Sequence, residues 1–177
     1  PPVIADFDGD GDLEIAAGND DGNLYVLHHD ASLMVEYSVG DDIRGGLAVA
    51  DLDSDGSLEL VFTGYDDHIH VWSPSLNIEL SGWPVDMGSN SLTGPVIADL
   101  DNDGDLEVVS STKTGDIYAL EHDGSLVDYF PFNVAGNVES SPAIGDLDND
   151  GDFELIFGTT MGLQVLDIKS EAGNVSS

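Results

Sequence analysis

The sequence predicts an all-β protein assembled from four copies of one small four-stranded unit. A nine-residue acidic segment occurs four times, as DFDGDGDLE, DLDSDGSLE, DLDNDGDLE and DLDNDGDFE, and the copies begin 45, 48 and 47 residues apart. Such a regular period is the signature of a repeat architecture. Strand-length apolar runs separated by turn residues fill the chain, and helical periodicity is absent.

Each repeat divides into β segments in the same order. The first apolar run leads into the acidic segment, at residues 2–6, 47–51, 95–99 and 142–146. The second run leaves it, at residues 13–17, 58–62, 106–110 and 153–157. After a turn comes a third, alternating segment, at residues 23–27, 68–72, 116–120 and 163–166. A weaker fourth segment is expected at residues 32–39, 75–81 and 125–132, whereas the last repeat ends without an obvious fourth strand.

Four short strands in a unit of about 45 residues are typical of one blade of a β-propeller. Sandwiches rarely repeat their sequence, and the coils of a β-helix are much shorter. The repeats fall at about 1–45, 46–93, 94–140 and 141–177, which gives three full antiparallel blades and most of a fourth. We expect them to belong to a larger ring of about 6 to 8 blades, within the range that propellers adopt.

The strongly acidic composition limits the kinds of molecule that the chain can bind. The formal charge is −33, from 36 acidic and 3 basic side chains, which disfavours nucleic acid and anionic membrane surfaces as partners and favours cations. There is no cysteine, and no apolar run approaches the roughly 20 residues that span a bilayer. Because the chain opens inside a repeat, we expect neighbouring domains in a larger secreted chain.

The acidic segments have the pattern of oxygen-rich cation loops. Counted from the first Asp, acids stand at positions 1, 3 and 5, Gly at position 6 and Glu at position 9, while the residue at position 7 varies. Ca²⁺ takes about six to eight oxygen ligands from carboxylates and backbone carbonyls. Alternate positions of a tight loop converge on one centre, and position 7 can contribute its carbonyl. Apolar side chains at positions 2 and 8 should point away from the ion, into the blade.

Electrostatics favours a bound cation over a solvated acidic turn. Two carboxylates about 4 Å apart repel by about 4 kcal/mol at an effective dielectric near 20. An EF-hand is a poor alternative, since its last ligand is at position 12 between helices, whereas here the last acid is at position 9 between strands. The candidate residues are Asp6, Asp8, Asp10, Asp12 and Glu14; Asp51, Asp53, Asp55, Ser57 and Glu59; Asp99, Asp101, Asp103, Asp105 and Glu107; Asp146, Asp148, Asp150, Asp152 and Glu154.

At these loops the chain resembles the FG-GAP and VCBS-like repeats, which are the blades of integrin α-subunit propellers and of many secreted bacterial proteins. All four loops match the DxDxDGxx[DE] motif. The naming elements are reduced to Phe157-Gly158, Gly94-Pro95 and Ser141-Pro142-Ala143, which favours the bacterial branch. The resemblance implies side-chain ligands at positions 1, 3, 5 and 9, one Ca²⁺ per repeat and an extracellular location.

Other candidate sites are weaker. The five histidines do not make a zinc site by their spacing, and surface or packing roles are expected for them. Trp83-Pro84 and Phe130-Pro131 follow the fourth strands and are expected to pack between blades rather than to stack on sugars. No serine-nucleophile motif or Gly-rich phosphate loop is found.

The sequence therefore favours a non-catalytic, calcium-stabilised scaffold, adhesion or interaction module that contacts an unidentified protein or glycan. The alternative is part of a calcium-dependent propeller enzyme acting on polysaccharide, similar to rhamnogalacturonan lyases. Paired carboxylates could serve a glycosidase, but their fourfold repetition argues against an active site. The excess of acidic residues also suggests a saline environment, in which counterions screen self-repulsion.

Overall fold

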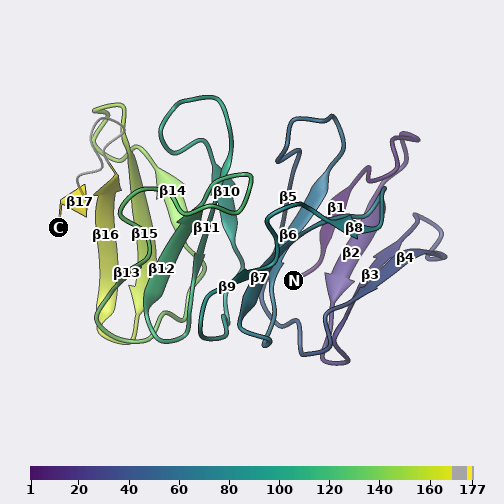
Figure 1. Cartoon of the computed structure of the whole chain (residues 1–177), viewed down its shortest axis with the longest axis horizontal. Helices are drawn as coiled ribbons and strands as arrows, with labels where there is room; N and C mark the ends of the chain where they lie inside the picture. Colours follow the sequence, from purple (N-terminus) through teal and green to yellow (C-terminus); the bar gives the residue numbers. More distant parts are fainter. Residues whose placement is uncertain (169–174, 177) are drawn as a thin grey trace.

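The computed structural model describes residues 1–168 and 175–176, and these fold into four antiparallel sheets placed side by side (Figure 1). Each sheet is one repeat, and we call the sheets blades 1 to 4. The strands of blade 1 are β1 (Val3–Ala5), β2 (Glu14–Gly18), β3 (Asn23–Leu27) and β4 (Leu33–Ser38). The strands of blade 2 are β5 (Leu47–Ala50), β6 (Glu59–Thr63), β7 (His68–Ser73), β8 (Ile78–Glu79) and β9 (Val85–Asp86).

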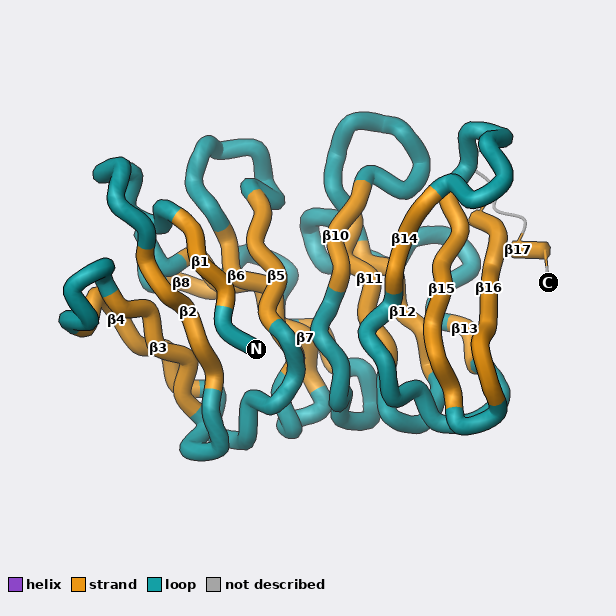
Figure 2. Tube along the Cα trace, turned by 180° about the vertical axis from the view of Figure 1, so that it is seen from behind, coloured by secondary structure: helices purple, strands orange, loops and turns teal. Residues whose placement is uncertain are grey.

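Blades 3 and 4 repeat this order. The strands of blade 3 are β10 (Val96–Ala98), β11 (Glu107–Ser111), β12 (Asp116–Leu120) and β13 (Phe132–Asn133). The strands of blade 4 are β14 (Ala143–Gly145), β15 (Phe153–Thr159), β16 (Gly162–Ile168) and β17 (Val175–Ser176). The four first strands, β1, β5, β10 and β14, lie next to one another along one side of the molecule (Figure 2). Four-stranded blades ordered in this way confirm the predicted propeller architecture.

The fourth strand of blade 1, β4, agrees with the expected segment 32–39, whereas those of the other blades differ from the sequence prediction. In blade 2 only β8 falls within the expected segment 75–81, and a second short strand, β9, follows it; both pair with β7. In blade 3 the expected segment 125–132 gives one isolated bridge, between Leu120 and Leu126, and then β13. Blade 4, for which no fourth strand was expected, has β17 paired with β16.

The interruptions have a physical cause in the Trp-Pro and Phe-Pro pairs. Proline has no N–H to donate to a ladder, and the aromatic residue before it turns into the core. Trp83 and Phe130 are 7% and 9% exposed, and each belongs to a hydrophobic cluster shared with the next blade. The Trp83 Nε1 donates a hydrogen bond of 3.1 Å to the His122 carbonyl of blade 3. The expected blade-to-blade packing of these residues is therefore confirmed.

The hydrophobic core lies between the blades. One cluster joins blades 1 and 2, a second joins blades 2 and 3, and a third joins blades 3 and 4. Position 2 of the first three acidic loops contributes to them: Phe7, Leu52 and Leu100 are at most 2% exposed, and each packs against the following blade. Burial of large apolar side chains such as these stabilises a fold by about 1.5–3 kcal/mol each.

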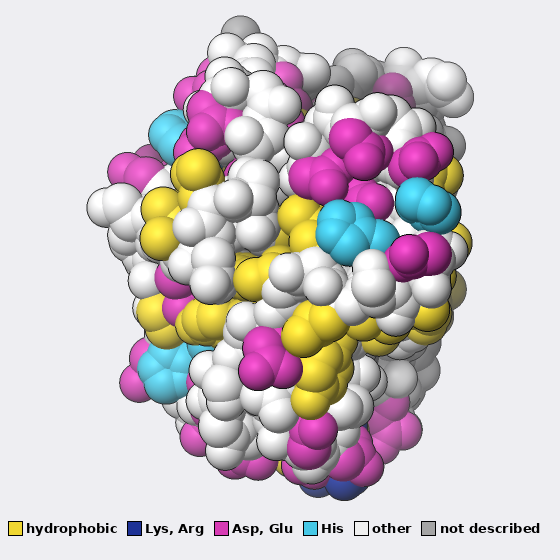
Figure 3. Space-filling view, turned by 90° about the vertical axis from the view of Figure 1, so that its right-hand side faces the viewer, with side chains coloured by type: hydrophobic (Ala, Val, Ile, Leu, Met, Phe, Trp, Pro, Cys, Tyr) yellow, Lys and Arg dark blue, Asp and Glu magenta, His cyan; other side chains and the backbone are white. Residues whose placement is uncertain are grey.

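The two outer flanks carry apolar side chains that are 38–71% exposed. On blade 4, Leu163 and Val165 are 71% and 46% exposed, and by strand register they correspond to the fully buried Ile117 and Ala119 of blade 3. Figure 3 shows the opposite flank, formed by blade 1, with hydrophobic side chains spread across it. The exposed members of these flanks are Ile4, Leu13 and Ile15 on blade 1, and Leu147, Leu163 and Val165 on blade 4.

The prediction that positions 2 and 8 point into the blade core is wrong for two residues. Leu147 at position 2 of the last loop is 58% exposed, and Leu13 at position 8 of the first loop is 54% exposed. Their counterparts are covered by a neighbouring blade, whereas no blade among the described residues covers these two flanks.

The described residues also include no helix long and apolar enough to cross a membrane.

Candidate metal centres

The four acidic segments form the connections between the first and second strands of the blades. We call them loop 1 (residues 6–14), loop 2 (51–59), loop 3 (99–107) and loop 4 (146–154). All four project from the same edge of the molecule, at the top of Figures 1 and 2. Because β1–β2 and its counterparts are antiparallel pairs, each loop closes a hairpin.

Three carboxylates of each loop accept main-chain hydrogen bonds in the same pattern. The Asp at position 1 accepts the N–H of the Gly at position 6 at 3.1–3.2 Å. The Asp at position 3 accepts the N–H of position 5 at 3.1–3.2 Å, and the Asp at position 5 accepts that of position 7 at 2.7–3.0 Å. These bonds fold the loop so that alternate side chains lie on one side.

The backbone of each loop enters the left-handed region at two positions. The Gly at position 6 has φ of 93° to 100°, as expected for a residue that permits a sharp turn. Position 4, which the sequence analysis did not single out, also has positive φ: Gly9 at 75°, Ser54 at 58°, Asn102 at 60° and Asn149 at 62°. Gly and Asn tolerate this conformation best, so the residue types at position 4 carried a signal that was missed.

The Glu at position 9 is the buried member of each loop. Glu14, Glu59, Glu107 and Glu154 are at most 5% exposed. In each, Oε2 accepts the main-chain N–H of position 2, at 2.5–3.0 Å. The second oxygen, Oε1, has no hydrogen-bond partner among the described residues in Glu14 and in Glu107. An acceptor buried without a partner costs about 1–3 kcal/mol, which a bound cation would offset.

The structure brings together positions 1, 3 and 9 as the most consistent ligand group. Their oxygens lie within 4.8 Å of one another in loops 2, 3 and 4. In loop 1 two groups meet the same limit, one of Asp6, Asp8 and Asp10 and one of Asp8, Glu14 and His28. In loops 2 to 4 the aspartates at position 5, expected as side-chain ligands, are outside these groups, as are the position-7 residues Asp12, Asp105 and Asp152 among the described residues.

Burial and the gathered charges raise the pKa values of two of these glutamates. Burial, together with the charges of neighbouring aspartates, raises the pKa of Glu59 to about 7. Burial likewise raises the pKa of Glu107 to about 7, with further contributions from Glu121, Asp101 and Asp103. An opposite charge nearby would stabilise the ionised form of both groups. The buried unpaired oxygens, the repelling carboxylates and the all-oxygen donor set of loops 2 to 4 fit a hard cation such as Ca²⁺.

The histidines fall into two environments. His70 is a buried residue between blades 1 and 2, with Nδ1 2.7 Å from the Glu79 Oε1 and Nε2 3.0 Å from the Asp66 Oδ2. Tyr37 donates a hydrogen bond to the same glutamate, and Phe62 stacks on the imidazole at 4.9 Å. His28, by contrast, lies beside loop 1, within 4 Å of two of its carboxylates.

Comparisons with known proteins agree with the repeat architecture. A model of the FG-GAP-like repeat matches residues 6–62, 51–110 and 99–157. No curated protein sequence matches the chain. The solved structure of the V. cholerae biofilm matrix protein Bap1 is 21% identical over 98% of this chain and 27% of its own, with a TM-score of 0.70.

Two further solved structures are similar. BamB from Moraxella catarrhalis is 18% identical over 100% of this chain and 50% of its own, with a TM-score of 0.64. The C-terminal domain of Pseudomonas aeruginosa PilY1 is 21% identical over 88% of this chain and 38% of its own, with a TM-score of 0.63. The chain thus spans half or less of the length of these three structures. Since the repeat model matches most of the sequence, the chain belongs to the FG-GAP-like repeat family.

Proposed function

We propose that the chain is a calcium-binding, non-catalytic propeller segment that serves as a scaffold or adhesion module of a secreted or cell-surface protein. The observation that carries the proposal is the buried glutamate at position 9 of each loop. It closes the loop through one oxygen, and in loops 1 and 3 it keeps the other without a hydrogen-bond partner among the described residues. A hard cation supplies that partner.

Repetition supports a structural role for the ion. The same hydrogen bonds recur in all four loops, and each loop joins two strands of a blade. Ca²⁺ that binds only the folded loops stabilises the native state by RT ln(1 + [L]/Kd), about 2.7 kcal/mol per site at 100-fold saturation. Four sites of this kind would contribute about 10 kcal/mol, comparable to the stability of a typical domain.

The calcium affinity expected for such loops supports an extracellular location. Extracellular calcium modules have dissociation constants of about 10⁻⁴–10⁻³ M, so extracellular calcium would fill the loops and cytosolic calcium would not. Bap1, a biofilm matrix protein by its description, has the same fold. We also propose that further blades cover the two apolar flanks, since their counterparts inside the structure are buried between blades.

The test is a melting curve in EGTA with Ca²⁺ or Mg²⁺ added back, together with metal analysis of the purified protein. Calcium should raise the midpoint sharply, and Mg²⁺ should replace it poorly because it needs a smaller octahedral shell. Asp101→Ala should release one ion, and Ser57→Ala should release none. An unchanged midpoint in EGTA, with no calcium in the purified protein, would contradict the proposal.

A further inference from the structure

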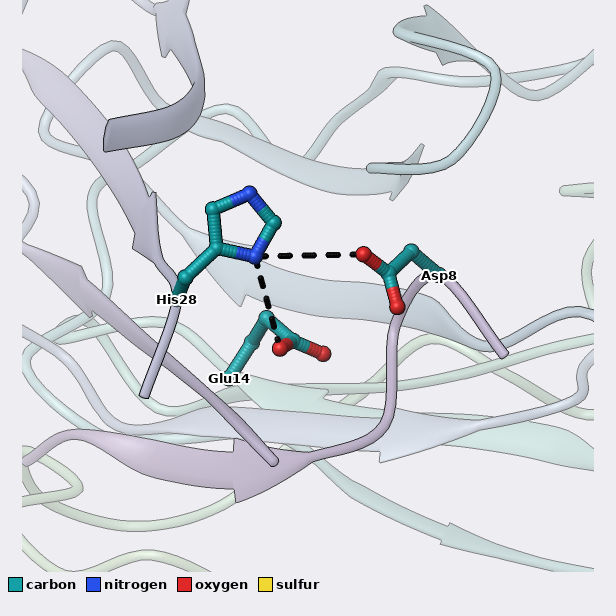
Figure 4. A group of neighbouring side chains, drawn as sticks. All are labelled: Asp8, Glu14 and His28. Carbon is teal, nitrogen blue, oxygen red and sulfur yellow. Dashed lines mark ion pairs between the residues drawn. The ribbon is translucent and has the colours of Figure 1, made fainter. Parts of the chain in front are cut away.

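A histidine lies opposite the buried glutamate of loop 1. The register of β2 and β3 pairs Ile15 with Leu27, which places Glu14 and His28 across from each other at the next position. The His28 Nδ1 is 3.6 Å from the Glu14 Oε1 and 3.8 Å from the Asp8 Oδ2. Figure 4 shows the imidazole nitrogen directed at both carboxylates, from the residue that follows the end of β3.

The glutamate supplies a second observation that points to a ligand. Its side chain is fully buried, and its Oε1 has no hydrogen-bond partner among the residues described. This is the oxygen that lies nearest the imidazole nitrogen, yet 3.6 Å is too long for a hydrogen bond. Ligands bound to one Zn²⁺ at about 2.0–2.2 Å lie roughly 3.3–3.5 Å apart in a tetrahedron. The observed separations are therefore close to those of atoms that share an ion.

The same register position differs in the other blades. Glu154 pairs with Asp167 in blade 4, and the strand pairings place Glu59 opposite Ser73 in blade 2 and Glu107 opposite Glu121 in blade 3. Of the four blades, blade 1 thus places an imidazole nitrogen, a possible metal ligand, opposite the glutamate of its loop. The other three place hydroxyl or carboxylate oxygens at that position. The loops share one main-chain design, and the facing residue makes their donor sets chemically different.

We propose that loop 1 is a transition-metal site that holds a Zn²⁺-like ion through His28 Nδ1 and the carboxylates of Asp8 and Glu14. Imidazole nitrogen favours Zn²⁺ and related ions, whereas carboxylates and carbonyls favour Ca²⁺ and Mg²⁺. Three protein ligands leave further positions for water or a neighbouring aspartate. The His28 side chain is 32% exposed, so an ion can reach it from solvent. The inference rests on the proposal that the acidic loops bind cations.

In the experiment, wild-type protein is first stripped of metal and then saturated with millimolar CaCl₂. ZnCl₂ is titrated into this protein in a calorimeter. One Zn²⁺ per chain should bind, and bound calcium should fall from four ions to three. His28→Gln should weaken zinc binding by about tenfold or more while four calcium ions are still bound. His28→Glu, which installs the residue of blade 3, should behave in the same way.

The matched control is His122→Gln. The His122 Nδ1 lies 3.8 Å from the Asp105 Oδ2 beside loop 3, so it is a histidine near one carboxylate of an acidic loop. This variant should bind zinc as the wild type does. Zinc binding that survives His28→Gln, that is lost in His122→Gln, or that is absent from the wild type in calcium would overturn the assignment.

The outcomes separate this inference from the proposed function. If the chain binds no calcium but holds one Zn²⁺ through His28, the zinc site stands and the calcium proposal fails. If four calcium ions bind and zinc does not compete, the calcium proposal stands and the zinc site fails. In calcium-saturated protein, a shift of the His28 imidazole NMR signals on zinc addition would be further support, and no shift would count against the site.

Discussion

Glu107→Gln in loop 3 should make the protein more stable than the wild type without calcium, and calcium should remove this advantage. The substitution keeps the size of the side chain and a carbonyl oxygen that can accept the Leu100 N–H, as the Glu107 Oε2 does now. It removes the charge and the second carboxylate oxygen, which has no hydrogen-bond partner among the residues that the structure describes. The variant therefore keeps the hydrogen bond that closes the loop but loses the oxygen and the charge that bind the ion.

The magnitudes follow from the pKa of Glu107, which burial and its acidic neighbours raise from 4.5 to about 7. For an acid whose folded pKa is raised, stability is lost as pH rises from about 4.5 through about 7. Above pH 7 without metal, the ionised glutamate therefore costs up to about 3 kcal/mol, at about 1.4 kcal/mol per unit. With calcium at 100-fold saturation, the wild type gains about 2.7 kcal/mol of ion binding that the variant lacks, which cancels most of this difference.

The assay is a pair of melting curves at pH 8, one in EGTA and one in excess CaCl₂. Because 1 kcal/mol shifts the midpoint of a domain of this size by about 2–4 °C, the variant should melt about 6–12 °C above the wild type in EGTA and within about 2 °C of it in calcium. At pH 5 in EGTA the difference should shrink. Asp105→Asn at position 7 removes the same charge without removing a side-chain ligand, and should bind calcium normally. A variant that is destabilised equally in both buffers would refute the reasoning.

Two further predictions concern charge. Burial lowers the pKa of His70, but its hydrogen bonds to Asp66 and Glu79 outweigh this and raise it to about 9. The stability that the protonated imidazole contributes is full below about pH 6.5 and is lost as pH rises through about 9, so in chemical denaturation His70→Gln should cost more at pH 6 than at pH 9.5; an equal cost would count against the ion pairs. Four Ca²⁺ would offset only about 8 of the 33 negative charges, so at fixed calcium the melting temperature should rise with NaCl, and a flat or falling midpoint would contradict this.

The sequence predicted the inner part of every blade well because that part is local. The third strands expected at 23–27 and 116–120 have those bounds in the structure, and the second strands differ by one to two residues at most. Each is half of a hairpin with a short turn, and its apolar pattern is set by neighbours close in sequence. The outer strands pair on one side only, so a single aromatic residue drawn into the next blade can split them.

Only the part of the site that lies within a single loop could be predicted from the sequence. Positions 1, 3, 5 and 9 lie within nine residues, and their spacing alone suggested a cation. His28 lies 14 residues from Glu14, and the register that places them opposite each other depends on the intervening turn. Aligning the end of each third strand with position 9 of its loop would have found it. The buried environment of His70 depends on Asp66, Glu79 and the neighbouring blade, which no motif encodes.

The residue at position 2 explains how an ion bound in an acidic loop can stabilise the packing between neighbouring blades. In loops 1 to 3 this residue gives its main-chain N–H to the buried glutamate of its own loop and its side chain to the core shared with the next blade. Phe7, for example, bonds Glu14 at 3.0 Å and packs in the cluster that contains Leu60 and Trp72. A cation that fixes the glutamate therefore also fixes an anchor of the neighbouring blade. Leu147 makes the same main-chain bond in loop 4, but its side chain is 58% exposed, so there the coupling is confined to one hairpin until another surface covers that flank.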